Sequence, residues 1–364
     1  MKRKMDSLQA LRAVACLSVF LNHCYVNTSG CAISVFVVLS GFLMVFTRYS
    51  RTDELSLSPI VNIRLAYSKM KGMYKLYIIT LLPIVFLEIF SIVKGNPMST
   101  FRQIIFEFII SVFMIQSWFS QHSMAFNGVA WYLSSALFLY FAFPYILRII
   151  RKYKSVKTAW LVMTALFAVE FAVSAAAPDI WRFASKHFSV AQENDFILWL
   201  TLISPPFRLI DFALGCNLGY IFLQCKDKEP KKSLVISLDI LTLVLFALSV
   251  FFFKANGYYL SQERFRHGLI FTPFALAAVY TFALARGRLP KLLTNKVTVF
   301  FGNLSNYFYL IHQDVIRFFL LLLTSAGMSF EVFRMVIIPI AFAVTMLLSM
   351  GYDRLVKRRK ALRV

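Results

Sequence analysis

Residues 234–253 read LVISLDILTLVLFALSVFFF, an apolar run that carries a single charge, at Asp239. A helix needs about 20 predominantly apolar residues to cross the hydrocarbon core of a bilayer. Lysines stand at both ends of the run, at positions 231, 232 and 254. The stretch therefore predicts a transmembrane helix.

The pattern recurs along the whole chain, which is 59% hydrophobic and only 15% charged, with a mean hydropathy of +0.69. Soluble domains are about 45–50% apolar and about 25% charged, so one water-soluble globule is excluded, as are disordered and collagen-like chains. The sequence predicts an all-α, polytopic membrane helix bundle forming a single domain over residues 1–364. Besides 234–253, the predicted spans are 7–26, 32–47, 74–93, 129–147, 158–177, 207–224, 268–284, 297–323 and 333–351.

The formal net charge of +22 is distributed in a way that argues against a nucleic-acid partner. Short basic loops beside apolar spans are typical of the cytoplasmic side of a membrane protein. Anionic lipid headgroups are the expected partners of such segments. Of the 39 lysines and arginines, 28 lie in six such segments, at 2–4, 48–75, 148–157, 226–232, 286–296 and 354–363.

Residues 101–119 form an eleventh apolar run. Successive cytoplasmic segments must be separated by an even number of crossings, and three runs lie between the basic segments at 48–75 and 148–157. The run at 101–119 carries Arg102 and Glu107, so we expect it to be re-entrant or interfacial. Ten spans then remain, with both termini in the cytoplasm, and no cleavable signal peptide is expected.

The cysteines and histidines show no metal-ligand spacing, so no metal is predicted. Cys24 and Cys31 flank the first outer loop. They could pair in an oxidising compartment, but burial as thiols is favoured because cysteine is among the most buried residue types.

Charged groups inside spans are costly and often mark function. Arg12 and His23 stand eleven residues apart on the first predicted helix, which places both on one face with an axial separation of about 16 Å. His23 suits general-base chemistry because histidine titrates near neutral pH. The alternative is that Arg12 reaches the headgroups and His23 hydrogen-bonds within the bundle. The other ionisable residues at membrane depth are Glu88, Glu170, Arg208, Asp211, His312, Asp314 and Arg317.

Five segments, in order along the chain, resemble motifs of the membrane acyltransferase-3 family, which O-acylates cell-surface sugars in bacteria. The first is DSLQALRAVA at 6–15 followed by His23, which resembles the family's Arg-x10-His motif. The others are SVFVVLSGF at 34–42, the tryptophan segment from 131 to 144, FRLIDFALG at 207–215 and SNYFYLIH at 305–312. The resemblance implies about ten membrane helices with both termini in the cytoplasm.

The resemblance also implies a chemistry, in which an acyl group, most simply acetyl, moves from cytoplasmic acyl-CoA (acetyl-CoA) to a hydroxyl of a surface glycan or its lipid-linked precursor. His23 is the expected general base, or the carrier of a covalent acyl group. Arg12, Lys69 and Lys71 would hold the CoA phosphates, with Ser40 beside the donor. Arg208 is the candidate for oxyanion stabilisation, and Ser305, His312 and Trp131 are expected to contact substrate. The protein would reside in the plasma membrane of a bacterium.

Two departures from the family pattern stand out. Many members carry glutamate where this chain has Ala136, and Gly72 and Lys75 replace an expected basic residue and proline before the third span. Arg208 and Asp211, three residues apart, could also simply neutralise each other. The rival functions are a polysaccharide exporter or flippase, for which we find no internal repeat, and a non-catalytic membrane scaffold.

Overall fold

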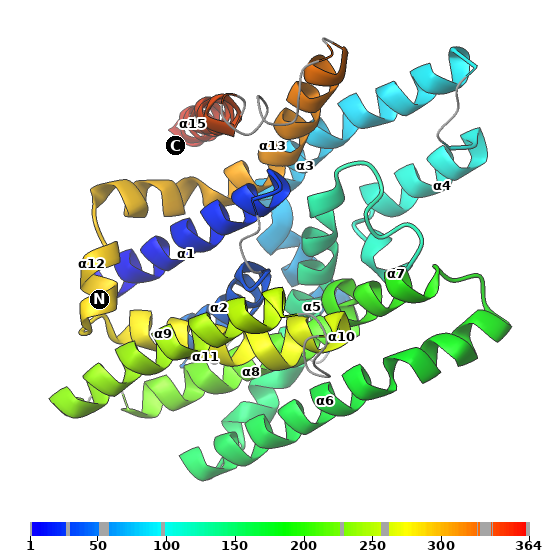
Figure 1. Cartoon of the computed structure of the whole chain (residues 1–364). Helices are drawn as coiled ribbons and strands as arrows, with labels where there is room; N and C mark the ends of the chain where they lie inside the picture. The colour runs from blue at the N-terminus through cyan, green and yellow to red at the C-terminus, as the bar shows by residue number, and fades with distance from the viewer. Residues whose placement is uncertain are drawn as a thin grey trace.

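The computed structural model describes residues 2–26, 30–50, 58–95, 99–225, 229–255, 262–325, 327, 336 and 338–361. These residues are predominantly helical, and no strand occurs among them (Figure 1). The main helices are α1 (Lys2–His23), α2 (Ala32–Arg48), α3 (Pro59–Val93), α4 (Phe101–Val112), α5 (Trp131–Arg151), α6 (Val156–His187), α7 (Glu193–Leu198), α8 (Pro205–Cys225), α9 (Lys232–Lys254), α10 (Glu263–Phe265), α11 (Phe271–Leu284), α12 (Arg288–Leu293), α13 (Lys296–Ser325) and α15 (Ile338–Ala361).

The all-α, multi-pass bundle predicted from the sequence is confirmed. Each of the ten predicted spans overlaps one of these helices, and the first part of the span predicted at 333–351 lies outside the described residues. Seven helical segments of the described chain are long and apolar enough to cross a membrane, and α2 is a shorter apolar helix. The stretch between the predicted spans 158–177 and 207–224 is largely helical, because α6 continues to His187 and α7 follows.

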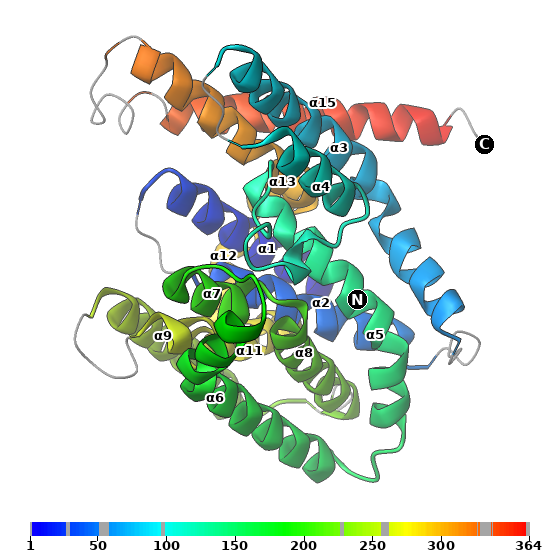
Figure 2. The same ribbon diagram turned by 90° about the vertical axis from the view of Figure 1, so that its right-hand side faces the viewer.

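The centre of the molecule is built around α2, which packs against α1, α8 and α11 (Figure 1). Helix α6 lies along one side of this group, and α13 and α15 lie along the other. Helix α15 runs at a steep angle to α1 and α6, because it is seen nearly end-on in Figure 1 and along its length in Figure 2. Cys24 and Cys31 are both buried and no disulfide joins them.

Glycines bring α2 and α8 into backbone contact. A Cβ atom on Gly215 of α8 would collide with the backbone of Val38, and one on Gly41 of α2 would collide with the carbonyl of Phe212. Small residues are enriched at helix interfaces in membranes because they let the two backbones approach closely. The interface thus depends on residues without side chains.

Replacing Gly215 with alanine should therefore destabilise the bundle by about 1–3 kcal/mol, the usual cost of overpacking a well-packed interface. Gly72 of α3 is the matched control, since a Cβ atom there would meet no atom within 4 Å. We expect Gly72→Ala to be neutral or stabilising, because alanine is the better helix former. Thermal unfolding of both variants in detergent measures the difference, and equal midpoints would refute the close contact.

Helix α4 accounts for the odd apolar run at 101–119. Its twelve residues span only about 18 Å, too short for a hydrocarbon core of about 30 Å. The last carbonyls of a helix lack partners within it. Here Tyr67, Tyr74 and Tyr77 of α3 donate hydrogen bonds to the carbonyls of residues 113, 112 and 111, at 3.0, 2.9 and 2.8 Å. These hydrogen bonds satisfy the carbonyls at the end of α4, so the helix can end after twelve residues. Such a short helix fits the expected re-entrant or interfacial element.

Candidate active site

Helices α1 and α13 lie side by side and run in the same direction. Near the start of the contact the guanidinium of Arg12 donates a hydrogen bond to the side-chain carbonyl of Asn306. Further along α1, the rings of Phe20 and Phe308 meet edge to face, with centroids 5.5 Å apart. At the end of α1, the rings of His23 and His312 lie 5.2 Å apart. Arg12 and His23 thus share a face, as their spacing predicts, and that face is covered by α13.

A cavity of about 300 Å³ opens beside Arg12, and we call it the inner cavity. Four of the residues predicted from the sequence line it: Arg12, Ser40, Lys69 and Ser305. The hydroxyl of Ser40 donates to the carbonyl of Phe36 at 2.8 Å, and that of Ser305 donates to the carbonyl of Gly302 at 2.7 Å. The cavity therefore combines two cationic side chains with polar and apolar walls.

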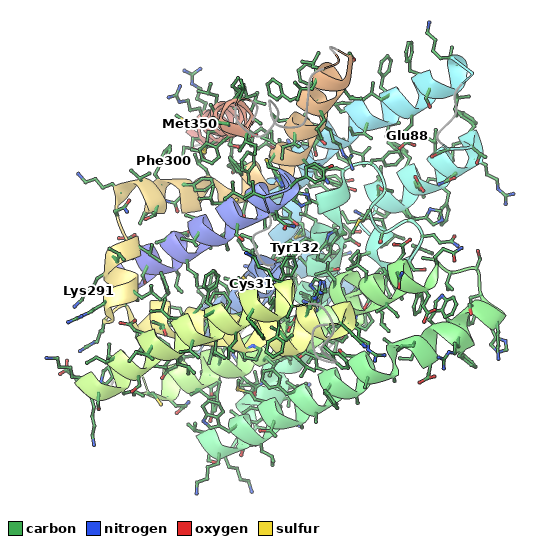
Figure 3. The ribbon with its side chains drawn as sticks, viewed as in Figure 1. Cys31, Glu88, Tyr132, Lys291, Phe300 and Met350 are labelled. Carbon is green, nitrogen blue, oxygen red and sulfur yellow. The ribbon has the colours of Figure 1, made fainter. Side chains whose placement is uncertain are left out.

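Aromatic side chains form the apolar part of this wall. Tyr132, labelled at the centre of Figure 3, packs edge to face against Tyr309, with ring centroids 5.7 Å apart. Phe36 lies 6.2 Å from the ring of Tyr309. Ala136 also lines the inner cavity. This position, noted above as a departure from the family pattern, is thus an apolar part of the cavity wall.

His312 is buried and held in one orientation. Its Nδ1 contacts the carbonyl oxygen of Tyr309 at 2.7 Å and that of Phe308 at 3.3 Å. Carbonyl oxygens only accept hydrogen bonds, so Nδ1 carries a proton and the neutral ring keeps its lone pair on Nε2. That Nε2 is buried without a hydrogen-bond partner among the described residues. His312 therefore offers a proton acceptor beside His23.

A second, larger cavity of about 1110 Å³, the outer cavity, opens beyond the histidines. Asp314 and Arg317 of α13 line it, together with Glu88 of α3 and Glu107 of α4. Glu107 accepts a hydrogen bond from Gln103 at 2.9 Å and lies 2.7 Å from Nδ1 of His122. One oxygen of Glu88 and one of Asp314 are buried without a hydrogen-bond partner among the described residues. The side chain of Glu88 is labelled in Figure 3, far from the labelled Lys291.

Helix α13 links the two cavities. Tyr309 lines the inner cavity and Arg317 lines the outer one, and eight residues of helix span about 12 Å. His312 stands on α13 between these two residues. Neither His23 nor His312 is among the residues that line these cavities, so the histidine pair lies between the cavity-lining residues of α13 but opens into neither cavity.

Hydrogen bonds join the turn before α5 to the segment of α13 around His312. Arg317 donates to the carbonyl of Phe126, and the amide of Asn127 donates to the carbonyl of Leu310 at 3.0 Å. The backbone N–H of Val129 donates to Gln313 at 2.8 Å. These bonds fix the part of α13 that carries His312.

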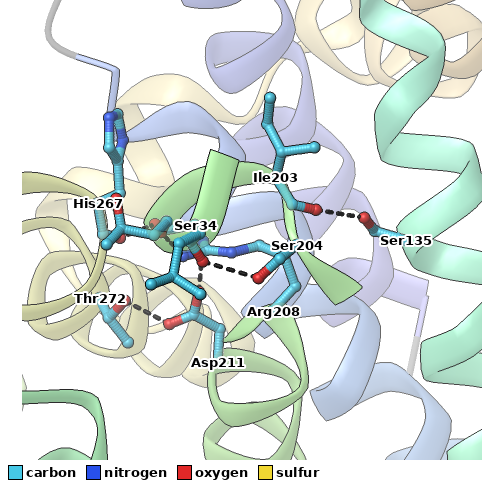
Figure 4. Close-up of polar contacts among 10 residues, drawn as sticks. Ser34, Ser135, Ile203, Ser204, Arg208, Asp211, His267 and Thr272 are labelled. Carbon is cyan, nitrogen blue, oxygen red and sulfur yellow. Dashed lines mark hydrogen bonds and ion pairs between the residues drawn. The ribbon is translucent and has the colours of Figure 1, made fainter. Parts of the chain in front are cut away.

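Arg208 lies elsewhere, in a fully buried cluster shown in Figure 4. Its guanidinium is 2.5 Å from the carboxylate of Asp211 and donates to the carbonyl of Thr201 at 2.7 Å. Thr272 donates to the other oxygen of Asp211 at 2.5 Å. Glu170 of α6 lies within electrostatic range of both charged groups. Arg208 is fully buried and lines neither cavity, so its contact with the reacting centre stays a prediction.

Lys71 and Trp131 are also separate from the cavities as the described residues define them. Lys71 is exposed and, unlike Lys69, does not line the inner cavity. Trp131 is buried at the start of α5, with its ring centroid 6.1 Å from that of Tyr132. Trp131 therefore packs against Tyr132, a residue of the cavity wall. Direct contact of Trp131 with substrate stays a prediction.

Several residues of the site were not assigned a role from the sequence. Asn306 lies inside the SNYFYLIH segment, so its position was available, but its bond to Arg12 depends on how α1 meets α13. Asp314 and Arg317 stood out as charges at membrane depth, without an indicated function. Tyr132 and Tyr309 lie in the family-like segments at 131–144 and 305–312, but their role in the cavity wall depends on how α5 and α13 pack.

The chain is similar in sequence to known acyltransferases. A family model described as an acyltransferase domain (Acyl_transf_3) matches residues 5–354. The acyltransferase MdmB of Streptomyces mycarofaciens is 26% identical over 244 residues, which cover 60% of this chain and 57% of that protein. The chain thus spans a little over half the length of this curated relative. No solved structure matches the chain. Because the family model covers nearly the whole sequence, the chain belongs to the acyltransferase-3 family of membrane proteins.

Proposed function

We propose that this protein transfers an acyl group, most simply acetyl, from cytoplasmic acyl-CoA to a hydroxyl group of a surface glycan or its lipid-linked precursor. The proposal places the enzyme in the plasma membrane of a bacterium. What supports it is the contact between His23 and His312, together with the residues of α13 on either side of His312 that line a cavity with two cationic side chains and a second, larger cavity.

The inner cavity suits the reactive arm of the donor. Its volume of about 300 Å³ is at the lower end of ligand pockets, enough for a slender thioester arm but not for the whole coenzyme. Tyr132, Phe36 and Tyr309 offer apolar surface to such an arm. Arg12 and Lys69 would hold the phosphates near the mouth, since charge-assisted bonds to phosphate are among the stronger hydrogen bonds.

The histidines suit proton transfer from the acceptor. His23 would take the proton of the acceptor hydroxyl while its oxygen attacks the thioester carbonyl carbon. The new ester bond forms, the carbon–sulfur bond breaks, and the leaving thiolate takes up the proton to give free CoA. His312 presents the unprotonated Nε2 next to this centre and would orient His23 or share its proton.

The outer cavity suits a hydroxylated acceptor. The unpartnered carboxylate oxygens of Glu88 and Asp314 can accept hydrogen bonds from hydroxyl groups. Leu87, Phe318 and Leu321 also line this cavity and give it an apolar flank. A sugar carried on an apolar body would satisfy both parts of the lining.

Purified protein in liposomes tests the proposal, with acyl-CoA supplied on the side of the basic loops. Release of free CoA together with acylation of an added glycan mixture supports the enzyme. Movement of glycan across the bilayer without consumption of acyl-CoA would instead support an exporter or flippase. Neither activity is expected of a membrane scaffold.

Arg12→Ala should raise the KM for acyl-CoA by roughly tenfold to a hundredfold, the usual range for a lost hydrogen bond to a charged group. The turnover number should change much less, because the contact holds the donor before and during reaction. Arg12→Lys should recover part of the loss. A variant with an unchanged KM would remove Arg12 from the donor site.

Lys69 and Lys71 provide a matched pair within the same assay. Both are exposed lysines of α3, but only Lys69 lines the inner cavity. Lys69→Ala should therefore raise the KM for acyl-CoA more than Lys71→Ala does.

A further inference from the structure

A third hollow, which we call the basic groove, lies away from both cavities of the candidate active site. It has a volume of about 660 Å³ and is formed by the start of α9, the end of α11 and the short helix α12. Four cationic side chains line it: Lys232, Arg286, Arg288 and Lys291. Figure 3 shows Lys291 at the outer edge of this end of the molecule. The two chain segments that supply these residues belong to the basic loops assigned to the cytoplasmic side.

Of the four cations, Arg286 alone forms an ion pair with another residue of the described chain. Arg286 pairs with Glu229 at 3.0 Å, but both side chains are largely exposed, and such surface pairs contribute little. None of the ion pairs among the described residues involves Lys232, Arg288 or Lys291. The groove therefore offers three cations to an external anion.

The carboxylate that lines the groove accepts hydrogen bonds from backbone N–H groups. Asp239 of α9 is buried, and its Oδ2 accepts hydrogen bonds from the N–H groups of Arg288 and Leu289 at 2.6 and 3.5 Å. A Cβ atom on Gly287 would collide with this carboxylate, so the turn before α12 lies directly on it. Asp239 thus fixes α12 against α9 and sets the position of the cationic side chains.

Apolar residues beside the cations indicate that the anion carries an apolar part. Val235, Ile236 and Leu284 line it. The outer face of α9 continues this surface with Ile240 and Leu243, which are 56% and 53% exposed. A ligand with a phosphate at one end and hydrocarbon chains at the other matches both surfaces, whereas a free phosphate matches only the first.

We propose that the basic groove is a binding site for the headgroup of an anionic phospholipid of the cytoplasmic leaflet, whose acyl chains lie along α9. Basic pockets at the cytoplasmic ends of membrane helices are suited to such headgroups. The bound phosphate would connect α9 with α12 and so stabilise the α9–α12 corner. This site is independent of the proposed acyl transfer.

The test compares lipids and variants of the full chain in a neutral detergent. Native mass spectrometry would follow binding of phosphatidylglycerol and cardiolipin, with phosphatidylcholine as the uncharged control. The triple variant Lys232→Gln, Arg288→Gln and Lys291→Gln should bind the anionic lipids at least roughly tenfold more weakly, because each basic residue near a lipid surface contributes appreciably. The charge-preserving variant Lys232→Arg with Lys291→Arg should bind as the wild type does.

A second triple variant controls for net charge. Three exposed lysines lie where α5 meets α6: Lys152 and Lys154 in the connection and Lys157 at the start of α6. Their replacement by glutamine removes the same charge elsewhere. This control should retain lipid binding. Equal weakening in both triple variants, or equal binding of phosphatidylcholine, would overturn the proposal. Competition by inorganic phosphate or CoA at the concentration of the lipid would show a free-phosphate site and would equally overturn it.

Discussion

Replacing His23 with alanine should lower the rate of acyl transfer by about 10²–10⁴, the usual contribution of a positioned general base. The variant should still reach the membrane, since His23 is the last residue of α1 and only partly buried. Release of CoA from acyl-CoA in proteoliposomes measures the rate. Turnover near that of the wild type would remove His23 from the mechanism.

His312 makes the test sharper, because the proposal treats the two rings as one unit. The double variant His23→Ala with His312→Ala should lose little more activity than the more damaging single variant, since residues that act together are not additive. His187→Ala is the control, because His187 is exposed at the end of α6 and its ring contacts Phe183. It should leave the rate unchanged.

The same variant distinguishes the two chemistries that the sequence left open. If His23 carries the acyl group covalently, the intact mass of the protein should increase after incubation with acyl-CoA in the absence of acceptor. That increase should disappear in His23→Ala. If His23 acts only as a base, no acylated protein should accumulate in either form.

The fold could be predicted from the sequence because the signals for membrane spans are local. A run such as 234–253 contains in itself the length and apolarity that a crossing needs. Even the short helix α4 was indicated by counting crossings between basic loops. The steep orientation of α15 was not predictable, since helix direction depends on packing against neighbours such as α13 and not on the apolar run itself.

The candidate site was predictable only along single helices. Helical geometry places Arg12 and His23 on one face, but it does not say which helix covers that face. The contacts with Asn306 and His312 arise from the parallel packing of α1 and α13, which no spacing within either helix reveals. For the same reason, Arg208 was expected at the reacting centre, whereas the structure buries it fully in a cluster with Asp211 and the carbonyl of Thr201.

Arg208→Met should destabilise the protein by about 3–5 kcal/mol, the cost of leaving a buried charge without its partner. Asp211 and Glu170 are both fully buried, and the substitution removes the cation that they face. Thermal unfolding in detergent measures the loss. The control is Arg182→Met, because Arg182 pairs with Asp179 at 2.7 Å over the same three-residue spacing but with both side chains mostly exposed. We expect that change to cost no more than about 1 kcal/mol.

The double variant Arg208→Met with Asp211→Asn then separates a positioning role from a catalytic one. Asparagine keeps an oxygen that can accept the hydrogen bond of Thr272 but removes the charge of Asp211, so the part of the stability that this charge cost should return, while Glu170 stays buried without the cation. If Arg208 only positions α8, acyl transfer should return together with stability. If its guanidinium stabilised the oxyanion directly, the double variant would be stable yet slow, and the assignment of Arg208 to a structural cluster would be wrong.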